Sequence, residues 1–168
     1  MHHITRINAN RGISLIETLV TIVIISVGML GIAALYVESL KAGQTAVMRT
    51  RAVAFAADMA DRIRTNQAGG VAYDVGPEAA GGAPPNACAD TTLAPALICT
   101  PDEMALNDIW AWKTMVGNTD DAQFQRIGLP NATATIDRNP ATVPVTYTIT
   151  INWADKNDDL SYSISVAI

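Results

Sequence analysis

Residues 13–36 read ISLIETLVTIVIISVGMLGIAALY and contain one charged side chain, that of Glu17. An α-helix rises about 1.5 Å per residue, so a helix of this length extends about 36 Å, more than the bilayer's hydrocarbon core of about 30 Å. The segment therefore predicts a membrane-spanning helix. A cleaved secretory signal is the competing interpretation. Such a signal has a shorter apolar region and a small-x-small cleavage site, which residues 37–43 match poorly.

The charges that flank the apolar segment predict its orientation. Arg6 and Arg11 precede it, whereas Glu38 and Lys41 follow it closely. Basic residues are retained on the cytoplasmic side of a membrane. We therefore expect a single pass through a membrane, with residues 1–12 in the cytoplasm and the bulk of the chain outside it.

Glu17 requires an explanation, because an ionisable side chain within a bilayer costs about 2.5 kcal/mol or more. Two interpretations remain open. If the chain were cut after Gly12, Ile13 would carry a new α-ammonium group, and Glu17 of one subunit could neutralise that group in a neighbour. Alternatively, Glu17 lies near the cytoplasmic interface, where its carboxylate reaches water.

The start of the apolar segment carries a recognisable motif. Residues 11–17 read RGISLIE, which resembles the class III leader of type IV pilins and pseudopilins. In that family a prepilin peptidase cuts after the glycine and methylates the new N-terminal amine, and the glutamate supports docking of the subunit into the filament. The resemblance implies cleavage between Gly12 and Ile13, N-methylation of Ile13 and docking through Glu17. The family usually has phenylalanine where this chain has Ile13.

Further motifs resemble the minor pilins called type IV pilus modification proteins, the PilV type. These motifs are SVGMLGIA at 26–33, DMADRIRTN at 58–66, Cys99, DIW at 108–110, WK at 112–113 and NW at 152–153. The resemblance implies an α+β, pilin-like fold, in which a long N-terminal helix packs on a small C-terminal antiparallel sheet. The domains would then be a leader (1–12), the transmembrane half of the helix (13–36) and a periplasmic globular domain (37–168).

The distribution of proline supports one long helix. No proline precedes Pro77, while all eight prolines fall between Pro77 and Pro144. Helix interiors exclude proline, so a continuous helix is predicted to about residue 66, with the Gly69-Gly70 pair as its stop. Its second half is amphipathic, with one apolar stripe of Met48, Ala52, Phe55, Met59 and Ile63. We expect this stripe to pack on the chain's own sheet rather than in a groove of a partner.

The rest of the chain predicts a loop, a helix and a hairpin. Residues 71–98 are rich in glycine and proline and read as a loop. Residues 100–103 read TPDE, a capping box with proline at the first helical position, so a helix is predicted from there to about residue 116. Residues 133–137 form a short candidate strand, and residues 145–153 and 162–168 alternate apolar and polar side chains, which predicts a β-hairpin.

Cys88 and Cys99 are the only cysteines and follow the apolar segment. An oxidising periplasm favours a disulfide between them, worth about 3 kcal/mol in the chain-entropy model. Two thiols without histidine make a poor zinc site. Cleavage after Gly12 would remove both histidines, so no histidine-based catalytic pair or metal site would remain. Accordingly, we expect no enzyme activity, no metal and no cofactor.

The sequence thus predicts an assembly subunit. A formal charge of −5 argues against a nucleic-acid surface. By the resemblance, the chain would be a minor pilin that helps prime or modify the type IV pilus for adhesion and twitching motility. Its partners would be the prepilin peptidase, other major and minor pilins and, before assembly, the inner membrane. Two alternatives are a minor pseudopilin of a type II secretion system and a single-span periplasmic binding module with an uncleaved anchor.

Overall fold

The computed structural model describes residues 14–78, 88, 99–117, 128–155 and 158–168, so the predicted cleavage edge at Gly12 and Ile13 lies outside the described residues. The chain divides into two compact units, residues 1–44 and 45–168. The elements are α1 (Leu15–Thr65), the 3-10 helix η1 (Gln67–Tyr73), α2 (Pro101–Val116), β1 (Thr133–Asn139), β2 (Thr146–Asp155) and β3 (Asp158–Ala167). The predicted α+β class, with a long apolar N-terminal helix and a small antiparallel sheet, is confirmed.

Helix α1 contains 51 residues and no proline, and it ends at Thr65, close to the predicted end. The Gly69-Gly70 pair was predicted to stop the helix, but it lies four residues further on, inside η1. Gly70 has a φ of 27°, which a side chain rarely adopts, so glycine allows the backbone to turn there. The prediction that the loop begins at residue 71 is wrong, because η1 continues to Tyr73, whose side chain is fully buried.

Helix α2 begins at the predicted capping box. The amide N–H of Glu103 donates to the Thr100 hydroxyl at 3.3 Å, and the amide N–H of Thr100 donates to the Glu103 carboxylate at 2.8 Å. Pro101 occupies the first helical position, where its missing N–H costs nothing. The helix ends at Val116, where the N–H of Gly117 bonds to the Lys113 carbonyl at 2.8 Å.

Replacing Thr100 with alanine is expected to destabilise the folded domain by about 1 kcal/mol. The substitution removes the hydroxyl that accepts a hydrogen bond from the Glu103 amide N–H in the first turn of α2. Urea unfolding of the full chain in detergent, followed by proteolysis of the unfolded fraction, measures this change. Serine at the same position keeps the hydroxyl and serves as the control. Equal stability of the alanine and wild-type chains would show that the cap contributes nothing.

The three strands form one antiparallel sheet in the order β1-β2-β3. The register pairs Ile136 with Ile149 and Ile149 with Ile164, so that apolar side chains of all three strands share one face. The predicted hairpin is confirmed as β2 and β3, while β1 extends beyond the predicted residues 133–137 to Asn139. Val75 pairs with Ile136 as an isolated bridge beside β1.

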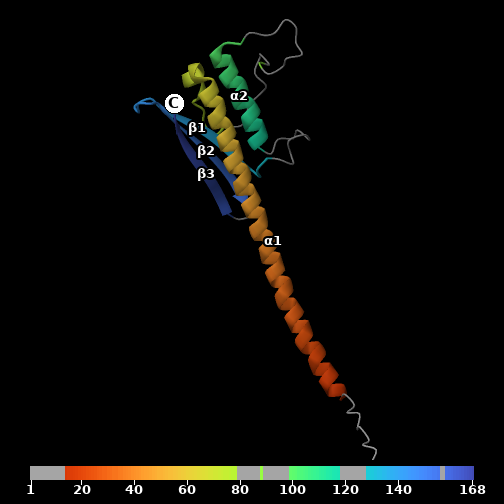
Figure 1. Ribbon diagram of the computed structural model, residues 1–168. Coiled ribbons are helices and arrows are strands. Elements are labelled where there is room, and N and C mark those ends of the chain that lie inside the picture. The colour runs from red at the N-terminus through yellow and green to blue at the C-terminus, as the bar shows by residue number, and fades with distance from the viewer. Residues whose placement is uncertain (1–13, 79–87, 89–98, 118–127, 156–157) are drawn as a thin grey trace, which may run out of the picture. The chain divides into compact units, whose positions relative to one another are not determined.

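The core of the unit formed by residues 45–168 has three layers. Figure 1 shows the later part of α1 between helix α2 and the sheet. Buried side chains of α1 share one hydrophobic cluster with the sheet and α2, and its α1 members are Ala52, Ala56, Met59, Ala60 and Ile63. The predicted packing of the apolar stripe on the chain's own sheet is thus confirmed, although Met48 and Phe55 are only partly buried. The alanines on α1 leave room for both neighbouring layers to approach closely.

Candidate functional site

The first part of α1 exposes an apolar surface that nothing in the described chain covers. All side chains from residue 15 to residue 44 are exposed, including Leu15 at 89% and Leu35 at 73%. By length and composition this helix is able to cross a membrane. The 22 residues from 15 to 36 extend about 33 Å as a helix, which matches the hydrocarbon core of a bilayer. An apolar surface of this length fits the hydrocarbon of a bilayer.

Glu17 lies in the first turn of α1 and is the only charged residue between residues 15 and 36. Its backbone N–H donates to the Ser14 carbonyl at 3.0 Å, so the helix begins just before it. Its side chain is exposed and forms no ion pair with any described residue. A carboxylate in this position is available to a group outside the described part of the chain. Its predicted role in docking stays a prediction.

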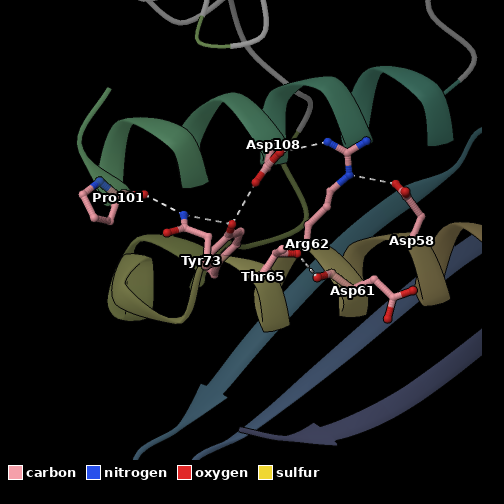
Figure 2. Close-up of polar contacts among 8 residues, drawn as sticks. Asp58, Asp61, Arg62, Thr65, Tyr73, Pro101 and Asp108 are labelled. Carbon is pink, nitrogen blue, oxygen red and sulfur yellow. Dashed lines mark hydrogen bonds and ion pairs between the residues drawn. The ribbon is translucent and has the colours of Figure 1, made fainter. Parts of the chain in front are cut away.

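A polar network joins the end of α1 to η1 and α2, as Figure 2 shows. The Arg62 guanidinium contacts the Asp58 carboxylate at 2.9 Å, one turn earlier on α1, and the Asp108 carboxylate of α2 at 2.8 Å. Burial by itself lowers the pKa of Arg62, but the hydrogen bonds and charges of Asp58 and Asp108 outweigh burial, so the net shift is upward. The guanidinium therefore stays charged and holds two helices together.

Tyr73 and Asn66 complete this network. The Tyr73 hydroxyl donates to Asp108 at 2.8 Å and accepts a bond from the Asn66 amide at 3.2 Å. The same amide donates to the Pro101 carbonyl at 2.8 Å (Figure 2). Burial raises the pKa of Tyr73 well above its ordinary value, and the charge of Asp108 adds to that rise. The hydroxyl therefore remains protonated and acts as a donor, a structural rather than a catalytic role.

Two further contacts fix α2 on its neighbours. The indole N–H of the fully buried Trp112 donates to the Phe55 carbonyl of α1 at 2.9 Å. Lys113 is 6% exposed, and its ammonium donates to the carbonyls of Gly76 at 2.6 Å and Glu78 at 2.8 Å. Burial lowers the pKa of Lys113, while the nearby charge of Glu78 acts in the opposite direction. The ammonium thus positions the chain that follows η1.

The predicted disulfide is present. It joins Cys88 to Cys99 with a Cα–Cα distance of 5.9 Å. Cys99 immediately precedes Thr100, the residue that caps α2, so the bond ties position 88 to the start of that helix. In the described part of the chain, no group of three or more His, Cys, Asp or Glu side chains is arranged to hold a metal ion.

The sequence analysis assigned Arg62 no partner, whereas the structure pairs it with a residue 46 positions away. The spacing of four residues between Asp58 and Arg62 is the one local pattern that indicates a contact of this network, the ion pair between these two side chains. Tyr73, Lys113 and the Trp112 indole N–H were not predicted, because no local pattern reports contacts between distant segments. Most of these residues fall within or near the motifs that carry the resemblance, at 58–66 and 108–113, so those motifs mark the junction of α1 with α2.

Two family models match the chain. Residues 34–110 match the model described as Type IV pilin Tt1218, and residues 7–33 match the model of the prokaryotic N-terminal methylation motif. Searches of curated proteins and of solved structures gave no significant match. The two matched segments are contiguous and cover residues 7–110, which include all of α1 and η1 and the first part of α2. The methylation motif is a cleavage site for prepilin peptidase, and the exposed apolar helix fits a membrane anchor. The chain therefore belongs to the type IV pilins, a family of structural subunits that assemble with other pilins.

Proposed function

We propose that this chain is a minor pilin of the PilV type, which helps prime or modify the type IV pilus for adhesion and twitching motility. The observation that carries the proposal is the exposed apolar helix, whose first turn carries Glu17 within the segment that matches the methylation motif. In a filament subunit one such helix would serve two successive roles. It would first anchor the chain in the inner membrane and would then contact other pilins in the filament. The chain would act without catalysis.

The proposed topology places the N-terminus in the cytoplasm. There, prepilin peptidase would cut between Gly12 and Ile13 and methylate the new amine of Ile13. The domain beyond the membrane would lie in the periplasm, where oxidising conditions fit the Cys88–Cys99 disulfide. The polar network of Arg62, Asp108 and Tyr73 would hold α2 and η1 on the helix that enters the filament.

Mass spectrometry of the mature N-terminus is the direct test of processing. We expect the mature chain to begin with N-methylated Ile13, and we expect a Gly12→Leu variant to retain residues 1–12. An intact Met1 in the wild-type chain would contradict the proposal and favour an uncleaved anchor. A wild-type chain cut elsewhere would contradict the assignment of Gly12 and Ile13.

Deletion of the gene distinguishes the pilus from a secretion pseudopilus. We expect loss of twitching and of surface pili with protein secretion unchanged. Loss of secretion with normal twitching would instead assign the chain to a type II secretion system. Complementation with the wild-type chain provides the control.

A further inference from the structure

The two edge strands of the sheet, β1 and β3, differ in the hydrogen bonds made on their outer sides. At the β1 edge, Val75 and Ile136 exchange two backbone hydrogen bonds of 2.9 Å each. The Asp74 carboxylate accepts a further bond from the Arg138 amide at 3.4 Å. At the other edge lies β3, and within the described residues no strand pairs with its outer side. The β1 edge is therefore partly covered by the chain itself, whereas no described strand covers the β3 edge.

The register identifies which backbone groups of β3 point outward. The N–H of Ile168 donates to the Val145 carbonyl at 2.9 Å, so Ile168 turns its backbone toward β2. In an antiparallel pair this direction alternates from residue to residue. The residues whose N–H and C=O point away from β2 are therefore Asp159, Ser161, Ser163, Ser165 and Ala167.

These outward-pairing positions lack the usual protection of a sheet edge. Natural edges are commonly blocked by lysine, proline or a bulge, which prevent another strand from pairing. Here Ser161, Ser163 and Ser165 are exposed, small and uncharged. A strand that pairs with them would bury no charge at these three positions.

The start of β3 lies beside a part of α1 that still exposes an apolar side chain. The Thr45 hydroxyl on α1 donates to Asp155, which pairs with Asp158, the first residue of β3. Two residues beyond Thr45, Val47 is 52% exposed, so the apolar surface of α1 continues to this point. A subunit that packs against α1 here would reach the beginning of the β3 edge.

We propose that the outer edge of β3 receives an extended segment from another pilin subunit, which adds a strand to the sheet. The inference rests on the proposed role of the chain as a filament subunit. Main-chain hydrogen bonds would supply the contact, as in other cases of strand addition, while the apolar surface of α1 would supply most of the buried area. The added strand would fix the angle at which the neighbour sits.

A proline substitution separates this edge from the rest of the fold. Ser163→Pro removes an outward N–H and leaves every backbone hydrogen bond between β2 and β3 in place, which edge strands tolerate. It also removes the exposed 3.1 Å side-chain bond between the Ser163 and Thr150 hydroxyls. We expect the amount of other pilins that co-purify with the processed full chain to fall about tenfold. Ser163→Val keeps the outward N–H, lacks the hydroxyl as proline does, favours a strand and is expected to behave as wild type. Resistance to trypsin should be the same for all three chains, which shows that the domain remains folded.

A photo-crosslinking residue identifies the occupant. In cells that express the full chain with the other pilins, a benzophenone side chain in place of Ser163 is expected to form an adduct with another pilin. The same side chain in place of Thr150, on the central strand, should give little adduct. An adduct with a second copy of this chain, or equal co-purification of pilins with the Ser163→Pro and wild-type chains, overturns the inference. If no pilin co-purifies even with the wild-type chain, it is the proposed function that fails.

Discussion

Trp112→Ala is expected to destabilise the domain by about 3–5 kcal/mol. The Trp112 side chain is fully buried between α2 and α1, and its removal leaves a cavity that the surrounding residues fill only partly. The loss is a large fraction of the stability of a domain of this size, about 5–15 kcal/mol. The fraction of molecules that are unfolded at physiological temperature should therefore be larger than in the wild type.

Two control variants show what the tryptophan contributes. Trp112→Phe keeps an aromatic ring but loses the N–H that donates to the Phe55 carbonyl, so we expect a loss of about 1–2 kcal/mol. Trp110→Ala removes the same residue type from a half-buried site and should cost less than Trp112→Ala. Urea unfolding of the full chain in detergent, read by pulse proteolysis, is independent of tryptophan signals. Equal losses at positions 110 and 112 would contradict the packing of α2 on α1.

The parts of the fold that the sequence predicted are those with a local physical cause. The capping box of Thr100 and Glu103 lies within four residues, so its reciprocal bonds follow from sequence spacing. The alternation along residues 145–153 reflects a strand with one buried face, and the sheet has that face. The length and composition of α1 likewise depend on the chain alone. In each case the neighbours that decide the structure are close in sequence.

The junction between α1, η1 and α2 could not be predicted in the same way. Arg62 meets Asp108, and Tyr73 meets Asp108, across separations of 46 and 35 residues. Many acidic residues lie at comparable distances along the chain, and no periodicity selects Asp108. Residues 71–73 read as a loop after two glycines, yet burial of Tyr73 and its bond to Asp108 extend η1 through them. Contacts between distant segments, rather than local sequence propensity, therefore determine the structure of this junction.

Glu17→Gln is expected to abolish incorporation of the chain into pili while the amount in the membrane stays equal or rises. If Glu17 of one subunit neutralises the N-terminal ammonium of a neighbour, its removal leaves that ammonium buried without a partner. Breaking a buried pair in this way costs about 3–5 kcal/mol, or roughly a hundredfold or more in the assembly equilibrium. The chain in sheared pili, relative to the chain in membranes, measures this ratio on immunoblots.

The amount of the Glu17→Gln chain in the membrane tests for a loss of anchoring, and its amount in pili separates the two interpretations of Glu17. A carboxylate within the bilayer opposes insertion, so its neutral amide should insert at least as well, and a loss of anchoring cannot explain a loss of assembly. Glu17→Asp retains the charge on a shorter side chain and should keep most of the incorporation. If the Glu17→Gln chain enters pili as well as wild type, the carboxylate serves no partner and simply reaches water at the interface. Glu17 has no ion pair with any described residue, so the partner that the glutamine variant would lose lies outside the described residues.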